Sequence, residues 1–233
     1  MQTDMTVGKP MKMLLNFTIP VFLGNVFQQL YSMADAVIVG KFVGTKGLAA
    51  VGATGTITFL IIGFLMGVTT GVTVLTSQKF GAGRMDEMRK TVGNAAILSA
   101  VIAVVMTAVS MLGMHRLLVF MHTPEDIFDG AYGYIMIICA GIFTQVLYNL
   151  VSSILRALGN SKTPLYFLIL AAGLNIVLDL VFIIFFHWGA PGAAWATVIS
   201  QGVSGVLCLI YMWKAVPELK MKKKTGILTV ILP

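Results

Sequence analysis

The chain has 233 residues, of which 58% are hydrophobic and only 11% charged, with a formal net charge of +7. A soluble domain carries about 25% charged residues, so this composition excludes a soluble globular protein and indicates an integral membrane protein surrounded by lipid. The basic residues stand at the ends of apolar runs without interleaved aromatic residues, which argues against a nucleic-acid partner.

Six apolar segments are long enough to cross a bilayer, since about 20 helical residues span its hydrocarbon core. They run over 14–39, 48–77, 92–114, 131–155, 164–186 and 192–213. The connections between them are short and rich in turn-forming residues, so consecutive helices should be antiparallel neighbours. We therefore predict an all-α integral membrane protein with a six-helix transmembrane bundle over 14–214.

Lys and Arg residues are divided unevenly between the two ends of these segments. With the N-terminus inside, the outer connections hold only Lys41, Lys46 and Arg116 of the 16 Lys and Arg residues. Basic residues favour the cytoplasmic side. The sequence therefore predicts a multi-pass protein of the cell membrane whose tails, 1–13 and the basic 215–233, are both cytoplasmic.

Small and helix-bending residues mark the first two spans. The second span carries Gly55, Gly63, Gly67 and Gly71, a small-residue face that is expected to let neighbouring helices approach closely. In the first span, Pro20 removes one intrahelical hydrogen bond, which predicts a kink or hinge in that helix.

Two acidic residues, Asp35 and Asp179, lie within predicted spans, whereas the other seven acidic residues are in loops or tails. A carboxylate in the membrane is costly unless it is paired, hydrated or protonated, so each is a candidate functional residue. The alternative is a purely structural Asp whose hydrogen bonds are satisfied by a polar neighbour. Asn175 precedes Asp179 by four residues and therefore shares its helix face.

Polar side chains form one stripe on each of four predicted helices. Hydrogen bonding between helices would explain any single stripe, but four stripes, two of them with a carboxylate, favour a shared polar interior or a water-filled cavity. The stripes consist of Asn25, Gln28, Gln29, Ser32 and Asp35; Gln145, Tyr148, Asn149, Ser152 and Arg156; Asn175 and Asp179; and Thr197, Ser200, Gln201 and Ser204.

Five stretches in order resemble the N-terminal half of the multidrug and toxic compound extrusion (MATE) transporters. They are PVFLGNVFQQLYSMADAVIVGKFVGTKGLAAVG (20–52), TSQKFGAGRMDEMRKTVGNA (76–95), LRALGNSKTP (155–164), NIVLDLVFIIF (175–185) and GAPGAAWATVISQ (189–201). The resemblance implies a cation-coupled antiporter, with no cofactor, that exports drugs or organic cations in exchange for Na⁺ or H⁺.

The resemblance also implies roles for individual residues. The positions that form the proposed cation site of the family match Asp35, Asn175, Asp179 and Thr197. A tyrosine that often lines the same pocket matches Tyr134, and a first-helix proline proposed to kink on protonation matches Pro20. Carboxylate, amide and hydroxyl oxygens suit a hard cation such as Na⁺.

The family has twelve spans and this chain has six, so we expect a truncated protein, or one that pairs with a second six-helix half or with itself. An inactive remnant or a membrane interaction module is an alternative. A second is a lipid-linked saccharide flippase of the same superfamily, which would need a basic cavity. An intramembrane enzyme is a third, but no accompanying protease signature is present.

Overall fold

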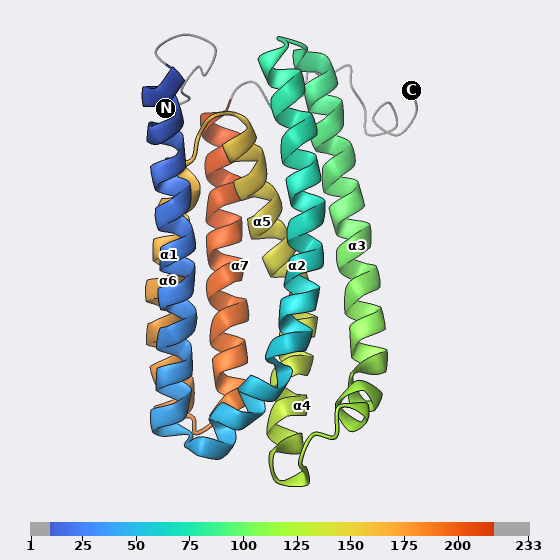
Figure 1. Ribbon diagram of the computed structural model, residues 1–233, viewed down its shortest axis with the longest axis vertical. Helices are drawn as coiled ribbons and strands as arrows, with labels where there is room; N and C mark the ends of the chain where they lie inside the picture. Colours follow the sequence, from blue (N-terminus) through green and yellow to red (C-terminus); the bar gives the residue numbers. More distant parts are fainter. Residues whose placement is uncertain (1–9, 217–233) are drawn as a thin grey trace.

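The computed structural model describes residues 10–216, and this part of the chain consists of helices joined by short turns, without strands. The helices form one elongated bundle (Figure 1). They are α1 (Pro10–Phe42), α2 (Thr45–Gly81), α3 (Met85–Phe120), α4 (Glu125–Ala140), α5 (Ile142–Ala157), α6 (Lys162–Leu180), the π-helix η1 (Val181–Phe185) and α7 (Gly189–Ala215). The predicted tails lie outside the described residues, apart from 10–13, which begin α1, and 215–216, which are the last residue of α7 and the residue after it.

The predicted membrane spans are present, with one difference. Within residues 10–216, five helical segments are long and apolar enough to cross a membrane by themselves, and α4 with α5 makes a sixth span that is bent by 46°. The predicted span over 131–155 is therefore present, but it consists of two helices that meet at a bend. Other helices extend past their predicted ends, because polar residues at the membrane surface continue the helix beyond the apolar stretch.

The bend between α4 and α5 lies at Gly141, where α7 approaches closely. A Cβ atom at this position would collide with the side chain of Val198 on α7. The hydroxyl of Thr144 donates to the carbonyl oxygen of Gly141 at 2.8 Å, which satisfies a backbone acceptor at the break. The missing side chain thus lets a broken helix and α7 pack against each other.

The interior of the bundle is built around α7, which packs against α4, α5 and α6. One cluster of buried apolar side chains includes Ile135, Ile142 and Ala193, and a second includes Val151 and Leu155. By contrast, α1 packs mainly against α6 and leaves much of its surface exposed.

The glycine face of α2 does not make the close helix contacts that we predicted. Gly55, Gly63, Gly67 and Gly71 are all exposed. A Cβ atom added at any of them would meet nothing within 4 Å among the described residues. This face of α2 points away from the other helices of the bundle.

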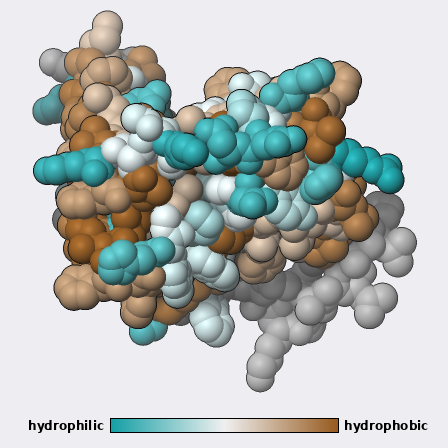
Figure 2. All heavy atoms as spheres, turned by 90° about the horizontal axis from the view of Figure 1, so that it is seen from below, coloured by the Kyte–Doolittle hydropathy of each residue, from teal (hydrophilic) through white to brown (hydrophobic). Residues whose placement is uncertain are grey.

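The two ends of the bundle differ in their basic residues. The start of α1 and the end of α7 lie at one end, together with the α2–α3 and α5–α6 connections (Figure 1). The opposite end holds Lys41 and Lys46, and Lys46 forms an ion pair with Asp126 at 3.5 Å. Figure 2 looks onto this end, where hydrophilic side chains gather between hydrophobic ones.

Candidate functional site

The carboxyl group of Asp179 lies deep in the bundle, one helical turn beyond Asn175 on α6. Both residues are completely buried. In the amide orientation that satisfies its neighbours, Asn175 donates to Oδ2 of Asp179 at 3.0 Å and accepts a hydrogen bond from the backbone N–H of Thr197 at 3.3 Å. Asp179 thus has one oxygen fixed by an amide, and the regular helix of α6 ends one residue later, where η1 begins.

A second carboxyl group, that of Asp35 on α1, lies close enough to Asp179 for the two groups to interact electrostatically. Oδ1 of Asp35 and Oδ1 of Asp179 are buried and have no hydrogen-bond partner among residues 10–216. A buried carboxylate oxygen without a donor is costly. Because two neighbouring negative charges repel each other, the pair favours a bound cation or a proton that reduces this charge.

Hydroxyl groups complete this part of the site. The hydroxyl of Tyr31 on α1 donates to Oγ1 of Thr197 on α7 at 3.1 Å. Tyr134 on α4 is buried and close enough to Tyr31, Asp35 and Asp179 to interact electrostatically with all three. Four helices therefore meet here, and we refer to the group that they form as the carboxyl cluster: Tyr31, Asp35, Tyr134, Asn175, Asp179 and Thr197.

The carboxyl cluster brings together all five residues that were predicted for cation binding. Within the described residues, no three His, Cys, Asp or Glu side chains come together in a way that could hold a metal ion. The oxygen atoms available here instead belong to two carboxyl groups, one amide and three hydroxyls, which are ligands suited to Na⁺ or partners suited to a proton.

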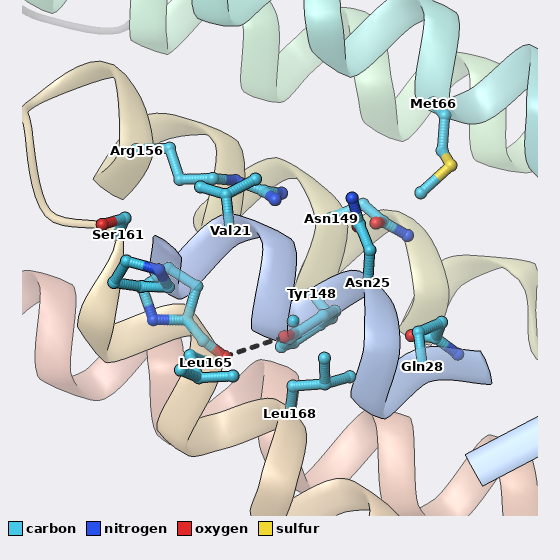
Figure 3. A pocket seen from close by; sticks show the side chains of 13 residues that line it. Val21, Asn25, Gln28, Met66, Tyr148, Asn149, Arg156, Ser161, Leu165 and Leu168 are labelled. Carbon is cyan, nitrogen blue, oxygen red and sulfur yellow. Dashed lines mark hydrogen bonds between the residues drawn. The ribbon is translucent and has the colours of Figure 1, made fainter. Parts of the chain in front are cut away.

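The other predicted cavity residues do not join this cluster. Asn25 and Gln28 on α1, with Tyr148 and Asn149 on α5, line a separate pocket nearer the end where α1 begins (Figure 3). Asn25 precedes Asp35 by ten residues, which corresponds to about 15 Å along a helix axis. Pro20 lines the same pocket, and α1 continues as a helix through it.

The remaining predicted residues fall into two groups. Gln29 and Ser32 are exposed on α1, and the hydroxyl of Ser32 donates to the carbonyl oxygen of Gln28 at 3.1 Å. Gln145, Ser200 and Gln201 are buried. Ser200 donates to the carbonyl oxygen of Thr197, so it supports the backbone beside the carboxyl cluster rather than facing a cavity.

Sequence reasoning missed Tyr31. Its position four residues before Asp35 places it on the same face of α1, and this spacing was the available signal. Aromatic residues are common in lipid-facing and packed membrane helices, so the residue type of Tyr31 does not by itself indicate a polar role.

The sequence of this chain is similar to that of known proteins. The sequence model of the MatE family matches residues 20–181. The chain belongs to the MatE family. It is 33% identical to the probable multidrug resistance protein YpnP of Bacillus subtilis (strain 168) over 211 residues, which cover 91% of this chain and 47% of the relative. It is 30% identical over 211 residues to YoeA, a probable multidrug resistance protein of the same strain, with 89% and 46% covered.

A solved MatE-type structure has the same arrangement of helices. It is described as the outward-facing conformation of a multidrug resistance MATE family transporter of the MOP superfamily. The two structures superpose with a TM-score of 0.88 at 28% identity, over 97% of this chain and 51% of that chain. The predicted resemblance to a six-helix half of a MATE transporter is confirmed.

Membership of the MatE family narrows the functional alternatives. MatE proteins are transporters and not enzymes, so the intramembrane enzyme is excluded. The multi-pass membrane topology is likewise confirmed by the helices and the family. The chain spans about half the length of the curated relatives that it matches.

Proposed function

We propose that this chain supplies the cation-coupling half of an antiporter that exports drugs or organic cations in exchange for Na⁺ or H⁺. The observation that supports this function most directly is the pair of buried oxygens, Oδ1 of Asp35 and Oδ1 of Asp179, that have no donor among the described residues. A cation or proton at this position supplies the missing partner and neutralises the pair.

The coupling step follows from the charge of the carboxyl cluster. When Asp35 and Asp179 are loaded, the charge that the membrane disfavours is compensated, and the helices that carry these residues can rearrange within the bilayer. When the pair is unloaded, its charge favours a conformation in which water reaches it. One elementary charge that moves across the whole membrane contributes about 2.3 kcal/mol per 100 mV, enough to bias export.

Partners and location follow from the same proposal. A second six-helix half, from the same polypeptide, another chain or a second copy, completes the transporter and closes the substrate cavity. The half-length match to the relatives supports this requirement. We place the protein in the plasma membrane with both ends of the chain in the cytoplasm, because most basic residues of the described helices gather at that end.

The flippase alternative has less support. A cavity for a lipid-linked pyrophosphate needs several basic side chains, and among the described residues Arg156 is the only charged one that lines the pocket between α1, α5 and α6. The carboxyl cluster contains no basic residue, and its two carboxyl groups can carry only the opposite charge.

Cation binding by the purified chain tests the proposal without requiring a second half. We expect Na⁺ at constant ionic strength, or a fall in pH, to raise the thermal unfolding midpoint of the wild type, because a ligand that binds only the folded state stabilises it. At a cation concentration 100 times the Kd, the stabilisation is about 2.7 kcal/mol. Asp179→Asn should abolish the response.

Asp129→Asn is the matched control, because Asp129 is an exposed acidic residue of α4 that does not belong to the carboxyl cluster. It should respond to the cation like the wild type. An unchanged cation response in Asp179→Asn would refute the coupling role. Efflux of ethidium from proteoliposomes under a Na⁺ or pH gradient then tests transport, with the same two variants.

A further inference from the structure

The pocket that contains Arg156 is separate from the carboxyl cluster and shares no residue with it. We refer to it as the Arg156 pocket. It is a cavity of about 70 Å³ between α1, α5 and the start of α6, with Met66 of α2 at its rim. Tyr148 lies along one wall, and its hydroxyl donates to the carbonyl oxygen of Pro164 at 3.0 Å (Figure 3).

Arg156 brings an uncompensated positive charge to this pocket. It occupies the last turn of α5 and is half-buried. Its Nε donates to the carbonyl oxygen of Ser152 at 3.3 Å. The ion pairs formed within residues 10–216 do not include it, and no Asp or Glu lines the pocket.

The guanidinium of Arg156 therefore has N–H donors that form no hydrogen bond within the described residues. Of its five N–H groups, the one on Nε is used, and the terminal nitrogens have no acceptor among the described residues. In Figure 3 the side chain extends across the pocket toward the side where Asn25 and Asn149 lie. The amides of Asn25 and Gln28 add further polar groups on the opposite wall.

The size and charge of the pocket define its ligand. A cavity of about 70 Å³ is much smaller than the roughly 300–1,000 Å³ of a pocket for a whole drug molecule. It suits one compact group. Arg forms its strongest hydrogen bonds with phosphate and carboxylate oxygens, because its planar fork matches their geometry.

We propose that the Arg156 pocket binds a compact anionic group of the phosphate type, with Arg156 as its charge partner and the amides of α1 as additional donors. Two sources share this chemistry. One is the headgroup of an anionic phospholipid, because the pocket lies at the basic end of the bundle, where such lipids meet cytoplasmic residues. The other is a soluble phosphate-bearing molecule.

Lipid binding to the purified full chain distinguishes these sources. Native mass spectrometry would measure bound phosphatidylglycerol against phosphatidylcholine with the same acyl chains, and thermal unfolding would be followed with added inorganic phosphate. We expect phosphatidylglycerol to bind preferentially. Arg156→Gln should weaken binding about tenfold, because a hydrogen bond to a charged group contributes that much.

Lys162→Gln is the matched control, since Lys162 is an exposed basic residue that begins the next helix and does not line the pocket. It should bind phosphatidylglycerol like the wild type. Asn25→Leu retains Arg156 and changes an exposed position, so it provides a second variant in case Arg156→Gln does not fold. It should weaken binding severalfold.

The results of these binding experiments either support one of the two ligand sources or overturn the proposed site. Loss of phosphatidylglycerol binding in the pocket variants alone supports the lipid source. Stabilisation by inorganic phosphate that depends on Arg156, without lipid preference, supports the soluble source. Equal losses in Arg156→Gln and Lys162→Gln, or no anion preference in the folded wild type, would overturn the site.

Discussion

Tyr31 links the first helix of the bundle to the last one through the hydroxyl of Thr197. The two oxygens are 3.1 Å apart, and Thr197 also donates its backbone N–H to Asn175 in the satisfied amide orientation. Tyr31 therefore positions the side of the carboxyl cluster that α7 provides. Its contribution is indirect, because its hydroxyl is hydrogen-bonded to Thr197 and not to either carboxyl group.

Tyr31→Phe tests this positioning role. The substitution retains the ring and removes the hydroxyl, so we expect unfolding to become easier by about 0.5–1.5 kcal/mol and cation stabilisation to weaken. Thermal unfolding with and without the cation measures both effects. Tyr166→Phe removes a hydroxyl from an exposed tyrosine of α6 and should change neither quantity. Equal behaviour of the two variants would contradict the role of Tyr31.

The sequence predicted the members of the carboxyl cluster better than the extent of the cavity. Helical spacing places Asp35 on the same arc as Gln29 and Ser32, but the structure buries only part of that arc against α6. Spacing defines a face of one helix, whereas burial depends on which neighbour covers each turn of it. Asn25 and Asp35 lie about 15 Å apart along α1, but only the positions of the neighbouring helices show that they belong to two separate sites.

At the scale of single helices, the break between α4 and α5 is the feature that the sequence did not predict. The apolar run over 131–155 is continuous, and an isolated glycine is tolerated within a helix. The decisive contact comes from Val198, which is 57 residues away along the chain and packs where a side chain at Gly141 would lie. Local sequence carries no signal for such a contact.

Gly141→Ala should destabilise the bundle. The added methyl group would overlap the side chain of Val198, and overpacking of this kind costs about 1–3 kcal/mol. The thermal unfolding midpoint of the purified variant measures the effect. Gly67→Ala is the matched control: a Cβ there meets nothing within 4 Å, and Ala is the better helix former. A stable Gly141→Ala protein would show that α7 does not require the glycine.

At the scale of the whole molecule, α1 and α2 present surfaces that the described helices do not cover. The glycine face of α2 is exposed along several turns, and α1 exposes Gln29 and Ser32 within its membrane span. Amide and hydroxyl groups are poorly suited to lipid. The second six-helix half that we propose would close a water-filled cavity over these exposed polar groups.

Cysteine labelling tests whether this side of α1 faces water. A charged, membrane-impermeant maleimide should modify Ser32→Cys rapidly in the reconstituted protein, because thiols react as thiolates in an aqueous environment. Leu30→Cys should react much more slowly, since Leu30 is a 52% exposed apolar residue that projects from a different side of α1 and is expected to face lipid. The native Cys139 and Cys208 are 0% exposed and give little background. Equal labelling rates at positions 30 and 32 would mean that α1 has no distinct water-facing side, and the exposed polar groups would then require a protein partner in direct contact.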